Sequence, residues 1–278
     1  MPPYSLSDLI YLMSRLRDPA DGCPWDLKQT YASITKHTLE EVYEVIDAIE
    51  RNDVVQLRDE LGDLLFQIVF YAQLAGEQGI FDFAAVADGI TQKLLRRHPH
   101  VFPDGTLLSR RQNTELTDAA IKAQWEQLKS QERNDKGQPQ ILADIPVALP
   151  ALLRAEKLQK RVAALGMDFA DAKAAIAGLK AEINELEAAL AGEPSDAIAD
   201  ELGDVLFSLV NVARHLKLDS EQCLRSANGK FSRRVVAMDG LITQRQAQWA
   251  DCDAEAFAAL WQEAKQIDDT NSSQIDAG

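Results

Sequence analysis

Apolar side chains recur at every third or fourth position over most of the chain, which predicts amphipathic helices. The alternation of apolar and polar positions that is typical of strands does not persist in any long segment. Turn-forming proline, glycine, asparagine and aspartate separate the helical segments, so the pattern predicts an all-α fold. The predicted helices lie at residues 5–17, 35–50, 54–76, 82–97, 117–132, 150–164, 172–191, 196–216, 219–247 and 254–267.

The order of these helices contains an internal repeat. The segment ELGDLLF, which begins at Glu60, returns as ELGDVLF at Glu201, 141 residues later. Basic and tryptophan-containing strings downstream return in the same order, with offsets of 137 and 136. We therefore predict two copies of one helical-bundle domain. The predicted parts are an N-terminal domain, a linker, a C-terminal domain and a frayed polar tail, at residues 1–133, 134–149, 150–268 and 269–278.

Each copy carries two acidic pairs spaced ExxE and ExxD, and this spacing places both acids of a pair on one helix face. The pairs lie symmetrically about residue 52 in the first copy and residue 193 in the second, both in polar turns. Two antiparallel helices folded at these turns place four carboxylates at one level, with axes about 8–10 Å apart. The eight acids are Glu41, Glu44, Glu60 and Asp63 in the first copy and Glu182, Glu185, Glu201 and Asp204 in the second.

Four carboxylates at one level repel one another unless a cation lies between them. Two unit charges about 4 Å apart cost around 4 kcal/mol at an effective dielectric near 20. All-oxygen ligation suits Mg²⁺ or Mn²⁺, whereas zinc and copper favour histidine and cysteine. A single acidic pair is usually solvated helix surface, but the same geometry occurs twice here, which favours two metal sites.

Basic and aromatic residues follow the carboxylates in both copies. Mg²⁺ held by a few carboxylates keeps coordination positions for water and for phosphates, and cations and flat rings nearby suit the rest of a nucleotide. The candidates are Lys93, Arg97, Trp125 and Lys129 in the first copy and Lys230, Arg234, Trp261 and Lys265 in the second. Seven residues after the ExxD aspartate, the second copy has Asn211, whose amide suits substrate binding, and the first has Phe70, which suits packing. This difference favours the second copy as the main catalytic unit.

Composition narrows the function classes. The chain has 29 Lys and Arg against 44 Asp and Glu, a net charge of −15, without a long basic run, which argues against direct nucleic-acid binding. Three widely spaced cysteines predict neither a disulfide framework nor a zinc site. Without a signal-peptide pattern or a run of about 18 apolar residues, we expect a cytoplasmic protein without a membrane partner. Phosphate-loop, calcium-loop and GxSxG motifs are absent from the sequence.

A family resemblance rests on the ExxE…ExxD hairpin and on the stretch RLRDPADGCPWDLKQTYASITKHTLEEVYEVIDAI, which begins at Arg15. These motifs closely resemble the MazG subgroup of the all-α nucleoside triphosphate pyrophosphohydrolases, and the similarity covers nearly the whole chain except the tail. The resemblance implies Mg²⁺-dependent hydrolysis of a nucleoside triphosphate to the monophosphate and pyrophosphate by an intertwined homodimer.

The resemblance also implies roles for the residues above. The eight acids would be metal ligands, with Glu182, Glu185, Glu201 and Asp204 forming the catalytic set, and the basic residues and tryptophans would contact the nucleotide. The chain departs from the family pattern at three positions. Ala181 replaces a glutamate, and Gln56 and Ala197 replace a lysine that relatives often carry.

Two other functions remain open at this point. The same acidic site would suit a phosphohydrolase that releases orthophosphate. A non-catalytic helical scaffold or regulatory protein would carry acidic clusters that bind only ions or a basic partner.

Overall fold

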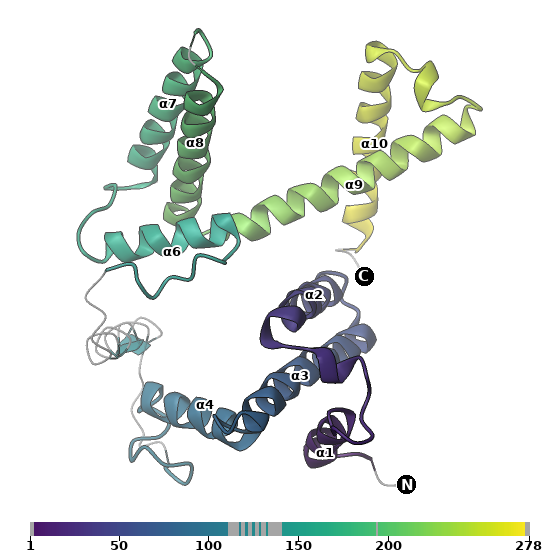
Figure 1. Ribbon diagram of the computed structural model, residues 1–278. Helices are drawn as coiled ribbons and strands as arrows, with labels where there is room; N and C mark the ends of the chain where they lie inside the picture. Colours follow the sequence, from purple (N-terminus) through teal and green to yellow (C-terminus); the bar gives the residue numbers. More distant parts are fainter. Residues whose placement is uncertain are drawn as a thin grey trace. The chain divides into compact units, whose positions relative to one another are not determined.

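In the computed structural model the chain forms two compact units, residues 1–132 and 133–278. The structure describes residues 3–110, 141–192 and 194–275, with single positions at 117, 120, 121, 124, 125, 128 and 132. Every regular element in this part of the chain is helical, nine α-helices and two short 3₁₀ helices, which confirms the all-α prediction (Figure 1). The helix predicted at 117–132 and the first half of the predicted linker lie mostly outside the described residues.

The first unit begins with four helices whose starts are fixed by side-chain caps. Their N-terminal caps are Ser5, Thr30, Asp53 and Asp82, and each accepts a hydrogen bond from a backbone N–H in the first turn. The helices are α1 (Leu6–Leu16), α2 (Tyr31–Glu50), α3 (Val54–Glu77) and α4 (Phe83–Arg97), with the 3₁₀ helix η1 (Asp26–Lys28) before α2. Helix α2 begins four residues earlier than predicted because Thr30 caps it.

The core of the first unit lies between α1, α2 and the second half of α3. Met13, Ile34, Val69, Phe70 and Leu74 are almost fully buried and contact one another. Each large apolar side chain that is fully buried in this half of α3 stabilises the folded unit by about 1.5–3 kcal/mol. The acidic first half of α3 is thereby held at the edge of the core.

Arg17 joins the ends of three elements of the first unit. Its side chain is 7% exposed, and Nε and Nη2 donate to the two carboxylate oxygens of Glu77 at 2.7 Å each. The same guanidinium donates to the backbone carbonyl of Asp26 and lies 5.4 Å from the centre of the Phe70 ring. Arg17 therefore ties α1 and η1 to the C-terminal end of α3.

The second unit consists of two helix pairs and a connecting helix. Its helices are α6 (Ala151–Ala163), α7 (Ala172–Ala189), α8 (Ser195–His215), α9 (Ser220–Gln244) and α10 (Ala254–Ile275), with η2 (Trp249–Asp251) before α10. Helix α7 packs along α8, α9 packs against α10, and α6 contacts both α8 and α9 (Figure 1). Met238, Ile242, Leu260 and Ala264 form the buried core between α9 and α10.

Helix α10 continues past residue 267, where the sequence pattern predicted its end, into the segment expected to fray. Asp268 is 6% exposed and accepts hydrogen bonds from Arg233 at 2.8 Å and Arg234 at 3.1 Å. This buried carboxylate anchors the last turns of α10 to α9. A hydrophobicity pattern does not reveal the anchor because its partners lie about 35 residues away.

Cys23, Cys223 and Cys252 are all free thiols. Among the helices of the described segments, none combines the length and the unbroken apolar character that a bilayer crossing requires.

We predict that Glu77→Gln destabilises the first unit, because it leaves the buried Arg17 guanidinium without its anionic partner. The expected loss in the free energy of unfolding is about 1–2 kcal/mol. Hydrogen bonds from Arg17 lower the pKa of Glu77, so this stabilisation is lost as the pH falls below the ordinary value of 4.5. Urea unfolding checks both effects. Asp59→Asn, which breaks the exposed Arg58–Asp59 pair, is the control, and an equal loss in both variants would contradict the assignment.

Candidate functional site

The α2–α3 hairpin positions the first carboxylate group. The chain reverses at Arg51, Asn52 and Asp53, where Asn52 takes a left-handed conformation with φ 54°. Glu41 on α2 and Glu60 and Asp63 on α3 then each offer a carboxylate oxygen, and these three oxygens lie within 4.8 Å of one another. We call this group the N-site. Three of the four acids predicted for this copy are brought together.

The α7–α8 hairpin repeats this arrangement in the second unit. Glu182 on α7 and Glu201 and Asp204 on α8 offer three oxygens within 4.8 Å of one another, and we call this group the C-site. Carboxylates of both groups are partly hydrated at the surface, with Asp63 and Asp204 the most exposed members. Two independent hairpins therefore produce the same cluster of hard oxygen donors.

The fourth acid of each copy lies beside its group without joining the close triplet. The pKa of Glu44 is raised by reduced hydration and then by the charge of Glu60. The charge of Glu185 is the largest electrostatic cause of the raised pKa values of Glu182 and Glu201, after reduced hydration. Both fourth acids therefore contribute to the negative potential of their sites.

The raised pKa of Glu41 has the same origin. Partial burial is its largest cause, followed by the charges of Asp63 and Glu44. A raised carboxyl pKa means that the folded protein binds protons more tightly than the unfolded chain. The metal-free protein therefore loses stability as the pH rises through the shifted values, and a divalent cation would remove that cost.

Gln56, named above only as a departure from the family pattern, contacts the N-site. Its Nε2 donates to Glu60 Oε1 at 3.0 Å, and its Oε1 accepts from Arg51 Nη2 at 2.6 Å. The amide thus orients one carboxylate of the N-site. The four-residue spacing on one helix was the available signal. Ala197 at the corresponding position of the C-site makes no such contact.

The structure does not bring the predicted basic and aromatic residues to the carboxylates within the described part of one chain. Trp125 Nε1 donates to the backbone carbonyl of Arg97 at 2.7 Å, and the Arg97 guanidinium contacts Glu132 at 2.5 Å. Lys93 lines a hollow on α4 with Phe81 and Ile90. Lys129 lies outside the described residues.

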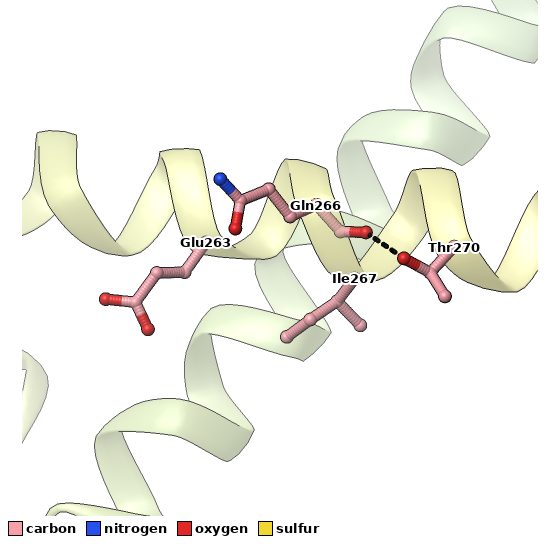
Figure 2. A pocket seen from close by; sticks show the side chains of 4 residues that line it. All are labelled: Glu263, Gln266, Ile267 and Thr270. Carbon is pink, nitrogen blue, oxygen red and sulfur yellow. Dashed lines mark hydrogen bonds between the residues drawn. The ribbon is translucent and has the colours of Figure 1, made fainter.

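The corresponding residues of the second unit gather between α9 and α10. Arg234 lies 5.7 Å from the centre of the Trp261 ring and donates to Asp268. Lys230 is exposed and Lys265 is half-buried. Trp261 also lines an apolar pocket of about 500 Å³ formed by α9, η2 and α10. A second hollow on α10, drawn in Figure 2, is lined by Glu263, Gln266, Ile267 and Thr270 and contains none of the predicted site residues.

Comparison with known proteins places both hairpins in one family. The model of the MazG nucleotide pyrophosphohydrolase domain matches residues 29–102 and 171–236, so each match contains one complete carboxylate hairpin. The chain belongs to the MazG family. The double match also supports the tandem repeat of helical domains, and membership makes the chain one of the MazG nucleotide pyrophosphohydrolases.

Curated relatives in the MazG family share almost the full length of the chain. The nucleoside triphosphate pyrophosphohydrolase of Escherichia coli (strain K12) is 46% identical over 259 residues, 92% of this chain and 95% of the relative. The nucleoside triphosphate pyrophosphohydrolase/pyrophosphatase MazG of Thermotoga maritima is 36% identical over 263 residues, 95% of this chain and 96% of the relative. The YabN protein of Bacillus subtilis, whose function is uncharacterized, is 35% identical over 277 residues, which cover 55% of its length.

We predict that Mg²⁺ binding weakens as the pH falls from neutrality to below the ordinary carboxyl value of 4.5, because protons compete for carboxylates whose pKa values are raised. Isothermal titration of the protein with MgCl₂ at a series of pH values measures the affinity. An affinity that stays constant over this range would contradict the involvement of the raised carboxyls.

We also predict that Glu60→Gln and Glu201→Gln affect the Tm in opposite ways in the absence and in the presence of metal. Removal of one negative charge relieves repulsion, so in EDTA the Tm of each variant equals or exceeds that of the wild type. Addition of Mg²⁺ raises the Tm of the wild type more than that of either variant. Glu187→Gln, at an exposed α7 carboxylate outside the C-site, is the control and should respond to Mg²⁺ as the wild type does. Variants with a full Mg²⁺ response would exclude these carboxylates as ligands.

Proposed function

We propose that this protein hydrolyses nucleoside triphosphates to the nucleoside monophosphate and pyrophosphate in a Mg²⁺-dependent reaction. The observation that carries the proposal is the convergence of three carboxylate oxygens within 4.8 Å in each of two hairpins. The Escherichia coli and Thermotoga maritima relatives, whose similarity covers over 90% of this chain, are named as nucleoside triphosphate pyrophosphohydrolases, and this supports the substrate class.

The donor set fits a hard divalent cation. Glu182, Glu201 and Asp204 would hold Mg²⁺ or Mn²⁺ in the C-site, with Glu185 beside them, and Glu41, Glu60, Asp63 and Glu44 would do so in the N-site. Mutual repulsion in both groups is a cost that such an ion offsets. When bound, Mg²⁺ supplies positive charge that neutralises phosphate oxygens and makes water more acidic.

The carboxylates have two tasks in this reaction. They would hold the metal that neutralises the triphosphate, and one glutamate of the cluster would accept a proton from the attacking water. The water oxygen forms a bond to the α-phosphorus while the bond from that phosphorus to the bridging oxygen breaks, and pyrophosphate leaves. Lysine and arginine side chains stabilise the charge that develops on the leaving group.

A homodimer would supply those cations. Lys230, Arg234, Trp261 and Lys265 remain our proposed nucleotide contacts in the second unit, with Lys93, Arg97, Trp125 and Lys129 as their counterparts. Within the described part of each unit, Arg97 pairs with Glu132 and Arg234 with Asp268, and not with the N-site or C-site carboxylates. Leu202, Leu206 and Leu209 on α8 are each about half exposed beside the C-site, and such apolar surface favours association with a second copy.

The C-site is the main catalytic site in this proposal. Asn211 lies on α8 two turns beyond Asp204 and is half-buried, so its amide is accessible to a substrate. Phe70 at the corresponding position of α3 is 1% exposed and belongs to the core. Polar recognition of a nucleoside is therefore available beside the C-site and absent at this position of the N-site.

We predict that the wild type converts a nucleoside triphosphate and Mg²⁺ to monophosphate and pyrophosphate, identified by ion-exchange chromatography. Glu201→Gln should lower kcat at least about 100-fold because a metal ligand is lost, whereas Glu60→Gln should lower it less than about threefold. Glu187→Gln should leave the rate unchanged. Release of orthophosphate would indicate a different phosphohydrolase, absence of turnover would indicate a non-catalytic protein, and full activity of both cluster variants would refute the metal-site account.

A further inference from the structure

Four polar side chains meet where the end of α8 contacts the loop between α6 and α7. Asp168 in this loop accepts hydrogen bonds from the guanidinium of Arg214, one of them at 3.0 Å, and its carboxylate lies 3.0 Å from His215 Nε2. Arg214 donates in turn to Asn211 Oδ1 from Nε at 3.1 Å and from Nη2 at 2.6 Å. The side chains of Arg214 and His215 are only 12% exposed, and that of Asp168 is 28% exposed. We call this group the α8 clamp.

Chemistry fixes the orientation of the Asn211 amide. A guanidinium donates hydrogen bonds and cannot accept them, so the amide atom that faces Arg214 must be the oxygen. Two donors occupy that oxygen, and the Nδ2 group therefore points away from Arg214. Among the described residues, the side-chain hydrogen bonds of Asn211 are both to its Oδ1. Asn211 thus presents Nδ2 as a hydrogen-bond donor, while its acceptor Oδ1 is already occupied by Arg214.

The clamp is rigid because its central ion pair is strong. The pKa of Asp168 is lowered to about 2, first by its hydrogen bonds to Arg214 and further by His215. The carboxylate is therefore ionised at any pH at which the enzyme would work. A charged, two-point Arg–carboxylate contact holds Arg214 in one orientation, and Arg214 transmits that constraint to Asn211.

Asn211 lies on the same face of α8 as the C-site. Seven residues separate it from Asp204, which corresponds to two turns and about 10.5 Å along the helix axis. Ser208 lies between them on α8 and has a small side chain. A nucleotide whose phosphates bind at the C-site could therefore extend along α8 toward the Asn211 amide.

Phe169 adds a flat surface at the same end of the helix pair. Its ring is 41% exposed and stands edge-on to His215, with ring centres 6.5 Å apart. The ring fits because residue 178 on α7 is glycine, since a Cβ atom there would lie 2.8 Å from the ring. A partly exposed aromatic ring at the same end of α8 as a fixed hydrogen-bond donor suits recognition of a nucleobase, which stacks on the ring and bonds to the donor through its edge.

The first unit provides a natural contrast. Its buried arginine, Arg17, pairs with Glu77 on α3 and lies over the ring of Phe70. Both units thus place an arginine–carboxylate pair next to the residue seven positions after the ExxD aspartate. Only in the second unit does that pair orient a polar group.

We propose that Asp168 and Arg214 are positioning residues that fix Asn211 as a pure hydrogen-bond donor, so that the C-site favours nucleobases with a carbonyl edge over those with an amino edge. This inference rests on the proposed function. Uracil, thymine and guanine present a carbonyl oxygen to such a donor, whereas cytosine and adenine present an amino group at the equivalent position. An unrestrained asparagine pairs with adenine by donating and accepting at once, and the clamp removes its ability to accept.

Steady-state kinetics with UTP, CTP, GTP and ATP test the specificity. For the wild type we expect kcat/KM for UTP and GTP to exceed that for CTP and ATP by about tenfold or more. Asn211→Asp keeps a partner for Arg214 but offers an acceptor, so the preference should invert. Asp168→Asn removes the ion pair that holds Arg214 in place, so Arg214 no longer fixes the Asn211 amide, and the preference should fall toward one through KM, with kcat within about twofold of the wild type. Equal discrimination in the wild type and both variants would overturn the inference.

A matched control separates positioning from general stabilisation. Asp144→Asn breaks the Arg161–Asp144 pair, which has two contacts of 2.7 and 2.8 Å and side chains 19% and 30% exposed, close to the values in the clamp. This variant should retain the wild-type base preference. A loss of preference as large as that of Asp168→Asn would assign the effect to stability.

A measurement without turnover distinguishes failure of this inference from failure of the proposed function. In ¹⁵N-labelled protein, the side-chain amide signals of Asn211 are identified by their loss in Asn211→Asp. We expect UMP with Mg²⁺ to shift these signals and CMP to leave them in place, and Asp168→Asn to move or broaden them without nucleotide. An enzyme inactive on every triphosphate would refute the proposed function, while signals insensitive to Asp168→Asn, or shifted equally by UMP and CMP, would refute the clamp.

Discussion

Repulsion among carboxylates held at one level by a helix hairpin is the constraint on which the rest of this structure depends. Neither α2–α3 nor α7–α8 would hold three carboxylate oxygens within 4.8 Å without other favourable contacts. In the first unit these contacts are visible: the apolar half of α3 lies in the core with Phe70 and Leu74, and Arg17 fixes its far end. The fold thus holds together carboxylates whose mutual repulsion a divalent cation would offset. Metal affinity therefore follows from the fold.

The two units share this hairpin but differ in the residue seven positions after the ExxD aspartate. Beside the N-site, the position seven residues after Asp63 is a buried phenylalanine packed under Arg17. Beside the C-site, the corresponding position is Asn211, held by Arg214. The carboxylate hairpin is thus duplicated, but the residue beside it is polar in one copy and apolar in the other. This difference is consistent with two copies that have different tasks, with nucleotide recognition concentrated in the second.

The sequence predicted those features whose spacing is local. Helical periodicity located the helices, and the symmetric spacing of the acids about residues 52 and 193 predicted which helices pair and, for three of the four acids in each copy, which carboxylates meet. Features that depend on distant partners were not predictable in this way. The α8 clamp joins Asp168 to a residue 46 positions away, and the end of α10 depends on Asp268 meeting Arg233 and Arg234. Periodicity reports which face of a helix is buried, but not which polar groups of other elements will meet that face.

Counting bound Mn²⁺ by electron paramagnetic resonance tests the central claim most directly. If both hairpins bind divalent cations, the wild type will bind Mn²⁺ at both sites, and Mg²⁺ will displace it. Glu60→Gln and Glu201→Gln should each reduce binding at one site, and the double variant should lose high-affinity binding at both. A double variant that binds as much Mn²⁺ as the wild type, with the same affinity, would contradict the account.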